Sequence, residues 1–285
     1  MLGLVICIVI VYFSGSKRYR QFKSILKGNG GQTMIMAHRG YSAVAPENTM
    51  PAFEKAYEIG VTAVELDVQM TKDGEIIVLH DDNLRRTTGV NRNVWDVTWD
   101  EIRTLDNGSF FSKEYEGTTI PKLEDVIRYC RGKMYINIEI KRNGHDEVIE
   151  DKVVKIIREN DFMDECDITS QDYETLRYIH ENYSDILVAY TSVVGIGNVL
   201  ELDAYDILSI QETFATFDSV EALHRQGKWV FVWTVNERDT MERLIGLNVD
   251  AILTNDPALA MEVMAEHTGF EDFHHRMEQI FFYMR

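Results

Sequence analysis

The sequence predicts an α/β domain of the TIM (β/α)₈ barrel type, made of eight parallel strands and the helices between them. Three observations predict this fold. Eight short apolar or alternating runs recur along the chain, helix-like stretches separate most of them, and 285 residues are enough for one barrel of about 250 residues. Eight strands favour a closed barrel, although the pattern alone leaves a doubly wound open sheet as an alternative.

Each expected strand is a short run rich in β-branched and aliphatic residues. The eight runs are Met34–Ala37, Thr62–Val68, Met134–Ile140, Asp167–Ser170, Ile186–Tyr190, Ile207–Ile210, Lys228–Trp233 and Asp250–Thr254. The stretches between them that carry apolar residues at helical spacing are Met50–Ile59, Leu123–Arg131, Val148–Glu159, Asp172–Asn182, Ser219–Gln226 and Arg238–Gly246. This alternation is typical of a parallel sheet with helical connections.

Two places break the alternation. Residues 71–74 (Thr-Lys-Asp-Gly) form a turn signal, and 75–80 follow with no room for a helix, so we expect a hairpin that returns His80 to a position roughly opposite Asp67. Between Asn83 and Gly117 the pattern is polar and irregular, and it contains four large aromatic residues: Trp95, Trp99, Phe110 and Phe111. We expect this segment to be a small inserted cap beside the barrel mouth.

The chain begins with an apolar run, Met1 to Phe13, and five basic residues follow it: Lys17, Arg18, Arg20, Lys23 and Lys27. A secretory signal carries its positive charge before the apolar run, and a helix of this length spans only ~20 Å of a ~30 Å hydrocarbon core. We therefore expect residues 1–31 to be an interfacial anchor or the end of a longer transmembrane segment, linked to a folded domain over 32–285. A packed N-terminal helix of a soluble protein is the alternative. The basic residues favour membrane association with a cytoplasmic domain.

Charge and cysteine content narrow the functional classes. With 47 acidic and 29 basic residues the net charge is −18, which disfavours nucleic-acid binding because a polyanion would be repelled. Carboxylates are also the hard oxygen ligands that divalent cations prefer. The three cysteines, Cys7, Cys130 and Cys166, are widely spaced, so they predict neither a disulfide framework nor a CxxC metal pair.

Two expected strands carry acidic residues at alternate positions. In Ala63–Val68, Glu65 and Asp67 share one face, and in Tyr135–Lys141 the residues that share one face are Asn137, Glu139 and Lys141. Carboxylates on a core strand are costly unless a cation or hydrogen bonds compensate them. Three inward acids near strand ends therefore predict a hard-cation site. Solvated charges on an exposed edge strand are the alternative.

Two histidines follow expected strands. His38 and Arg39 come directly after the first strand, and His80 closes the hairpin beside the acidic strand. Each histidine taken alone is compatible with a structural role. Together, next to the acids, they suggest one general base and one general acid, with Arg39 and Lys141 holding phosphoryl oxygens and the cation neutralising developing charge.

These residues lie in segments that closely resemble the glycerophosphodiester phosphodiesterase family. Five motifs match its opening signature within about 45 residues: His38-Arg39-Gly40, Pro46-Glu47-Asn48-Thr49, Glu65-Leu66-Asp67-Val68, Thr71-Lys72-Asp73-Gly74 and Leu79-His80-Asp81. Later matches are Ile120-Pro121-Lys122-Leu123-Glu124, Glu139-Ile140-Lys141, Trp233-Thr234-Val235-Asn236 and Ile252-Leu253-Thr254-Asn255-Asp256-Pro257. The resemblance covers roughly residues 34–262.

The resemblance implies a TIM barrel with an insertion over 83–117 and hydrolysis of glycerophosphodiesters to an alcohol and glycerol 3-phosphate. It also implies a role for each matched residue. His38 and His80 correspond to the catalytic pair, and Glu65, Asp67 and Glu139 to the ligands of a divalent ion, Ca²⁺ or Mg²⁺. Arg39 and Lys141 correspond to phosphate contacts, Glu47 to an acid that supports a histidine or the metal, and Trp233 to a residue that lines the pocket. One position departs from the family pattern, because Ser170-Gln171 stands where members often carry Ser-Phe.

Two other functions remain as alternatives. The apolar start and the aromatic cap are compatible with a lysophospholipase D-like enzyme that acts on lipids with the same two-histidine chemistry. A catalytically silent phosphodiester-binding module would be expected to have lost a histidine or an acid, and the sequence retains all of them.

Overall fold

A computed structural model describes residues 32–192, 199 and 201–269 of the chain. Its strands are β1 (Met34–His38), β2 (Ala63–Met70), β3 (Ile76–Val78), β4 (Tyr135–Ile140), β5 (Cys166–Ser170), β6 (Leu187–Ser192), β7 (Ile207–Gln211), β8 (Trp229–Trp233) and β9 (Ala251–Thr254). Its helices are α2 (Met50–Glu58), α3 (Arg85–Thr88), η1 (Val94–Asp96), α4 (Trp99–Ile102), η2 (Lys113–Tyr115), α5 (Leu123–Cys130), α6 (Ile149–Glu159), α7 (Tyr173–Asn182), η4 (Glu212–Phe214), α8 (Phe217–Arg225) and α9 (Arg238–Gly246). Residues 257–269 are also helical.

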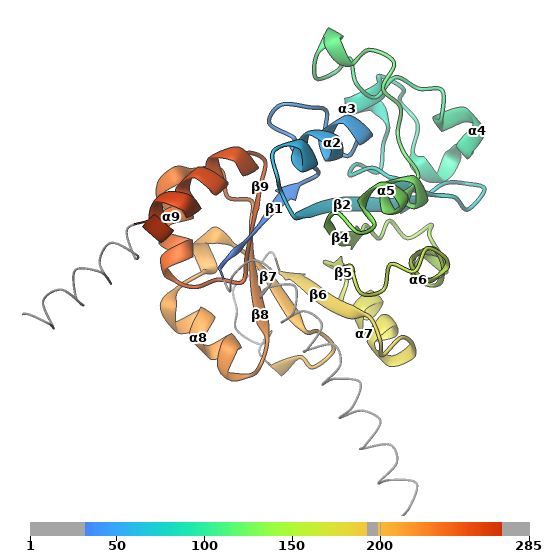
Figure 1. Ribbon diagram of the computed structural model, residues 1–285. Coiled ribbons are helices and arrows are strands. Elements are labelled where there is room, and N and C mark those ends of the chain that lie inside the picture. The colour runs from blue at the N-terminus through green and yellow to red at the C-terminus, as the bar shows by residue number, and fades with distance from the viewer. Residues whose placement is uncertain (1–31, 193–198, 200, 270–285) are drawn as a thin grey trace, which may run out of the picture.

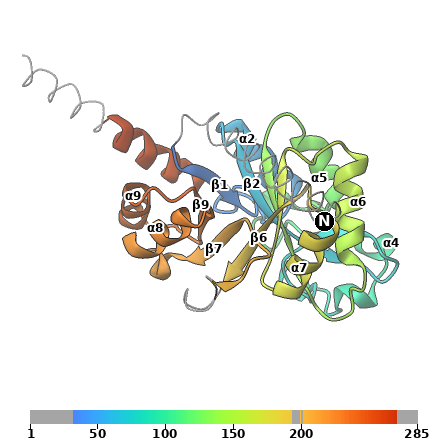
Figure 2. The same ribbon diagram turned by 90° about the horizontal axis from the view of Figure 1, so that it is seen from below.

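The strands form one closed sheet. Their order is β1-β9-β8-β7-β6-β5-β4-β2-β3, and a further parallel pairing of β1 with β2 closes the circle. Figure 1 shows the long helices outside the strands, and Figure 2 shows the same arrangement after a quarter turn. The structure therefore confirms the predicted barrel of eight parallel strands and excludes the doubly wound open sheet.

The predicted hairpin is also present. Strand β3 runs antiparallel to β2, with Val78 opposite Val68. Just beyond this register, the amide of Leu79 donates a hydrogen bond to the carbonyl oxygen of Asp67 over 2.9 Å. His80 therefore follows β3 at the level of Asp67, as the turn signal in the sequence predicts.

The acidic strand β2 is buried on both faces. Val64, Leu66 and Val68 pack outward in the main hydrophobic cluster, while Glu65 and Asp67 point into the barrel with exposed fractions of 2% and 1%. A strand that pairs with β1 on one side and β4 on the other is central, so the alternative of an exposed edge strand with solvated acids is wrong.

The interior of the barrel has an apolar part near the beginnings of the strands and an acidic part near their carboxyl ends. A separate apolar cluster of inward residues fills the part near the strand beginnings: Met34, Met36, Ala63, Tyr135, Leu187, Ala189, Ile207, Trp229, Phe231, Ala251 and Leu253. The acidic residues of β2 and β4 lie toward the carboxyl ends of the strands. Chemistry in TIM barrels takes place at these ends, because the loops that follow the strands surround them.

Residues 83–117 leave the barrel as a small irregular unit, drawn from cyan to green at the upper right of Figure 1. Its residues Leu84, Val94, Val97 and Ile102 form an apolar cluster with residues of the hairpin and of the chain after the segment: Ile77, Leu79 and Ile120. Contacts with the barrel loops hold it in place. The Trp95 ring stacks on His145 with 4.5 Å between centroids, and the Tyr115 hydroxyl donates to the carbonyl oxygen of Val44 over 2.9 Å.

The expectations for residues 1–31, an apolar membrane segment followed by basic residues, lie outside the described residues. Within the described part of the chain, every helix is too short or too polar to traverse a bilayer. Cys130 and Cys166 are buried free thiols, as the spacing of the cysteines suggests.

A further buried acid lies on the neighbouring strand β5, in register with Asn137. Asp167 on β5 accepts a hydrogen bond from the Asn137 amide and has no exposed surface. Burial raises its pKa from an ordinary value of 3.8 to about 7, against the lowering effect of hydrogen bonds from Tyr135 and Asn137. The folded chain therefore holds a proton on Asp167 over a pH range in which the unfolded chain has lost it.

This proton predicts a stability that falls as pH rises. Between about pH 4 and pH 7 the folded state binds more protons at Asp167 than the unfolded state, so the free energy of unfolding decreases with pH, by up to roughly 4 kcal/mol in total. In urea unfolding with EDTA present, the free energy of unfolding of Asp167→Asn should fall less steeply with pH than that of the wild type over this range. A substitution of an exposed acid, Asp164→Asn, serves as control. If the free energy of unfolding had the same pH dependence in the wild type and in Asp167→Asn, the proton would not be held by Asp167.

Candidate active site

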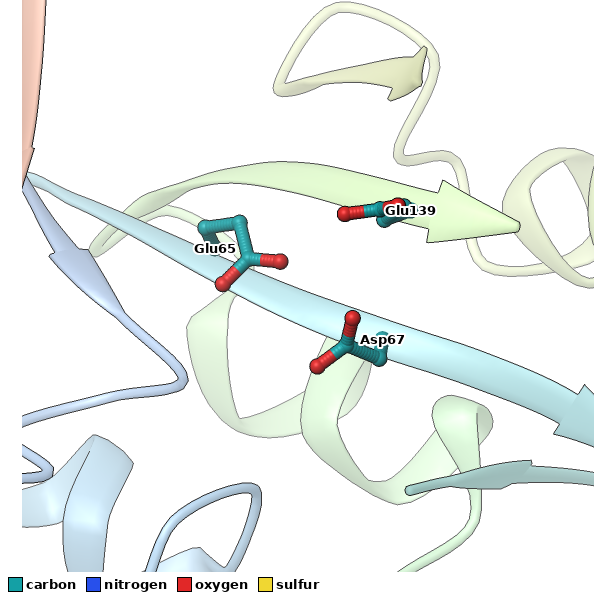
Figure 3. A group of neighbouring side chains, drawn as sticks. All are labelled: Glu65, Asp67 and Glu139. Atoms are coloured by element: carbon teal, nitrogen blue, oxygen red, sulfur yellow. The ribbon is translucent and has the colours of Figure 1, made fainter. Parts of the chain in front are cut away.

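Three carboxylates converge at the carboxyl end of the barrel. Asp67 on β2 and Glu139 on β4 occupy paired positions in the sheet, and Glu65 lies two residues before Asp67 on the same face. One carboxylate oxygen from each residue lies within 4.8 Å of the other two. Figure 3 shows Glu65 and Asp67 on β2 and Glu139 on the neighbouring strand β4. The structure therefore brings together the acids that the strand alternation singles out.

The cluster is electrostatically unfavourable by itself. Burial, followed by repulsion from Asp67 and Glu139, holds the pKa of Glu65 well above its ordinary value. Burial and Asp67 likewise raise the pKa of Glu139. Burial also acts to raise the pKa of Asp67, but Arg39 and Lys141 outweigh it and lower that pKa. The trio therefore needs positive charge close by.

Two basic side chains supply part of that charge. The Arg39 amide donates to Oε2 of Glu65 over 2.9 Å, its Nε lies 3.3 Å from Oδ2 of Asp67, and its Nη1 donates to Glu47 over 2.8 Å. Lys141 Nζ lies 3.1 Å from Glu139 Oε1 and 3.7 Å from Asp67 Oδ1. Arg39 and Lys141 thus flank the cluster from β1 and β4.

The cluster nevertheless keeps free oxygens that suit a metal. Glu65 Oε1 and Asp67 Oδ1 are buried and accept no hydrogen bond from any described residue. Buried polar atoms normally have a hydrogen-bond partner, so two carboxylate oxygens without a hydrogen bond next to a third acid call for explanation. An oxygen-binding divalent cation fits this donor set in charge and chemistry.

His38 lies at the end of β1 with both ring nitrogens facing polar atoms. Its Nδ1 is 2.7 Å from Oδ1 of Asn255, and its Nε2 is 3.8 Å from Oε2 of Glu65. Burial, and next the positive charge of Arg39, lowers the pKa of His38 to about 4. Because the Asn255 oxygen can only accept, Nδ1 carries the proton, and a neutral ring presents an unprotonated Nε2 to the cluster.

His80 lies where the hairpin meets the insertion and is more exposed than His38. Its Nδ1 is 2.8 Å from Oδ1 of Asp81. Burial acts to raise the pKa of Asp81, but hydrogen bonds from Arg86 and His80 lower it to about 2. Asp81 is thus a carboxylate that accepts the Nδ1 proton of His80 and orients the ring.

A cavity of about 70 Å³, which we call the inner cavity, joins most of these groups. Seven residues singled out from the sequence line it: His38, Arg39, Glu65, His80, Glu139, Lys141 and Trp233. The indole Nε1 of Trp233 is buried without a hydrogen-bond partner among the described residues. Asp67 lies between Arg39 and Lys141 just beside this cavity. Glu47 lies farther out and pairs with Arg39 and Arg86.

Comparisons with known proteins agree with this geometry. A model of the glycerophosphoryl diester phosphodiesterase family matches residues 38–259. The chain belongs to this family. It is 35% identical over 236 residues to a glycerophosphodiester phosphodiesterase of Caldanaerobacter subterraneus, and this match covers 79% of the chain and 95% of the relative. It is 34% identical over 245 residues to a glycerophosphodiester phosphodiesterase of Bacillus altitudinis, and that match covers 82% of the chain and 99% of the relative. The chain is therefore an enzyme of the glycerophosphodiester phosphodiesterase type.

Solved structures of related proteins share the fold. An Oleispira antarctica phosphodiesterase, solved in complex with the product sn-glycerol 3-phosphate, superposes with a TM-score of 0.77 at 26% identity over 83% of this chain and 98% of that one. A glycerophosphodiester phosphodiesterase from Agrobacterium tumefaciens gives a TM-score of 0.72 at 26% identity, over 80% and 98% of the two chains. The match extends over nearly all of each relative.

Sequence reasoning assigned no role to three residues that shape this phosphodiesterase site. Asn48 donates to Asp67 Oδ2 over 2.8 Å, and Asn255 contacts His38. Both lie inside motifs quoted for the family resemblance, which was the available signal. Arg86 donates to both Glu47 and Asp81, and so connects the surroundings of Arg39 with those of His80. No pattern in the sequence pointed to Arg86.

The contact with Asn255 predicts a positioning effect on His38. Asn255→Ala should lower kcat about 10-fold with the fold intact, because the tautomer of His38 is no longer fixed. Asn255→Asp should raise the pKa of His38 and move the acid limb of the pH–rate profile to higher pH. Ser42→Ala, which removes another hydrogen bond to the Asn255 side chain, is the control. An unchanged pH profile in Asn255→Asp would contradict the assignment.

Proposed function

We propose that this phosphodiesterase hydrolyses glycerophosphodiesters to an alcohol and glycerol 3-phosphate, with a divalent metal and two histidines as general base and general acid. The observation that carries the proposal is the convergence of His38, His80 and the acidic trio around one small cavity. Membership of the family supports the substrate class, and the product complex of the Oleispira antarctica relative supports glycerol 3-phosphate as product.

Glu65, Asp67 and Glu139 would hold the metal, which we propose to be Ca²⁺ or Mg²⁺ because all three ligands are carboxylates. When bound, the ion supplies positive charge to the phosphoryl oxygens. Arg39 and Lys141 add fixed charge from either side and bind the phosphate. Trp233 contributes a buried indole N–H that is free to donate to the substrate.

The roles of the histidines follow from their surroundings. His38 is neutral at physiological pH, so its Nε2 can accept the proton of the attacking hydroxyl, which belongs to water or to the neighbouring glycerol. As the bond from phosphorus to the leaving oxygen breaks, His80 donates the proton that this oxygen needs. His80 suits the acid role because it also lines a larger cavity at the mouth, where the alcohol would leave.

Residues 1–31 extend the proposal beyond the barrel. We infer from their apolar run and basic cluster that they attach the catalytic domain, residues 32–285, to a membrane, with the domain on the cytoplasmic side. The lipid-cleaving alternative predicts a different product, lysophosphatidic acid. Product analysis of a lysophospholipid and a water-soluble diester separates the two functions.

The acid–base assignment predicts a severe loss of activity in two variants. His38→Ala and His80→Ala should each lower kcat by at least about 100-fold, because each removes a proton-transfer group, while thermal unfolding changes little. Release of glycerol 3-phosphate from a glycerophosphodiester is the assay. His224→Ala, which removes a histidine paired with Asp250 on the surface, is the matched control. Near-normal turnover in His38→Ala or His80→Ala would refute the assignment of these two histidines as general base and general acid.

The metal site predicts a second phenotype. EDTA should abolish turnover, and added Ca²⁺ or Mg²⁺ should restore it. Asp67→Asn should raise the metal concentration for half-maximal activity by at least about 10-fold, because one ligand charge is lost. The exposed Asp100→Asn is the control. Activity that survives exhaustive chelation would rule out the metal requirement.

A further inference from the structure

A second, larger cavity opens beside the inner one. We call it the outer cavity; its volume is about 1110 Å³. One wall comes from Asp82 and from the start of the inserted segment, with Arg85 and Asn91. The opposite wall follows β4 and β5 and includes Arg142 and Gln171. The segment after the hairpin therefore forms one side of the space above the barrel.

The two cavities share four lining residues: His80, Glu139, Lys141 and Gln171. A phosphodiester held at this junction would extend into both. The inner cavity is lined by two of the proposed metal ligands, Glu65 and Glu139, and by Arg39, so it suits the phosphate half that all these diesters share. The outer cavity is left for the alcohol. This step rests on the proposed function.

The charged groups of the outer cavity fall into two kinds. Arg142 is fixed by Glu150 at 3.0 Å and Asp146 at 3.5 Å, and Arg86 is fixed by Glu47 and Asp81. These cations are already neutralised by their own partners. They therefore contribute polarity to the wall but little free charge to a ligand.

The wall formed by Asp82 and the start of the inserted segment, in contrast, offers side chains without partners. Within the described part of the chain, the side chains of Asp82, Arg85 and Asn91 make no hydrogen bond or ion pair, although all three line the outer cavity. Together they supply an anionic acceptor, a cationic donor and an amide that both donates and accepts. The charges of Asp82 and Arg85 cancel, so this wall selects neither an anion nor a cation.

This chemistry fits one class of alcohol. A quaternary ammonium group is typically held by aromatic rings, and no Phe, Tyr or Trp occurs among the described residues that line the outer cavity. An acyl chain needs apolar walls, and Ile140 is the only aliphatic side chain in that same set. Hydroxyl groups both donate and accept, as the free groups do. We propose that the preferred alcohol is a polyol, such as glycerol or inositol, bound through Asp82, Arg85 and Asn91.

The test compares diesters that differ only in the alcohol. We expect kcat/KM for glycerophosphoglycerol and glycerophosphoinositol to exceed that for glycerophosphocholine by about 10-fold or more, because a site built to bind hydroxyls discriminates against a group without them. Arg85→Ala and Asp82→Asn should each reduce this preference severalfold, mainly through KM for the polyol diesters. Arg103→Ala, an exposed arginine of the same segment paired with Asp100, should leave the preference unchanged.

The outcomes separate this inference from the function on which it rests. Equal kcat/KM values for polyol and choline diesters, or a preference that Arg85→Ala and Asp82→Asn leave intact, would overturn the polyol assignment while the phosphodiesterase activity stands. Preferred cleavage of a lysophospholipid would also overturn it. Failure to release glycerol 3-phosphate from every diester would instead refute the proposed function.

Discussion

The site depends on the burial of three carboxylates between β2 and β4 at the carboxyl end of the barrel. Glu65 and Asp67 are almost fully buried, and burial together with repulsion within the trio raises the pKa of Glu65 and Glu139. A domain has only about 5–15 kcal/mol of net stability, so uncompensated buried charge of this kind would be a large fraction of it. Arg39 and Lys141 offset part of this cost, and the two carboxylate oxygens that lack a hydrogen bond indicate where a cation would offset the rest.

The barrel explains how residues so distant in sequence come to share this environment. Parallel strands all end at the same rim, so β1 supplies His38, β2 and β4 supply the acids, and the loop after β9 supplies Asn255. The hairpin is the exception that completes the set, because it returns His80 to the rim without a crossover helix. The insertion starts three residues after His80, which places its first polar residues beside the position where a leaving group would depart.

Most of this arrangement could be predicted from the sequence, because it follows from local rules. Alternation on two strands put Glu65, Asp67 and Glu139 on inward faces, and a turn signal predicted the return of His80. What could not be predicted comes from contacts between distant segments. Arg86 lies 39 positions from Glu47 in the sequence, and no pattern in either segment predicts that the two side chains pair. The free groups of the outer cavity also became visible only once the ion pairs of Arg86 and Arg142 showed which charges were already satisfied.

Direct observation of an ion tests the central claim most sharply. Crystals of the enzyme grown with Mn²⁺, an anomalous scatterer that shares the oxygen ligands of Mg²⁺ and Ca²⁺, would locate the site without reference to activity. We predict one strong anomalous peak within bonding distance of the carboxylates of Glu65, Asp67 and Glu139, with both histidines beside the same cavity. A peak bound elsewhere, or a lysine ammonium that occupies the position between the carboxylates at saturating Mn²⁺, would contradict the account.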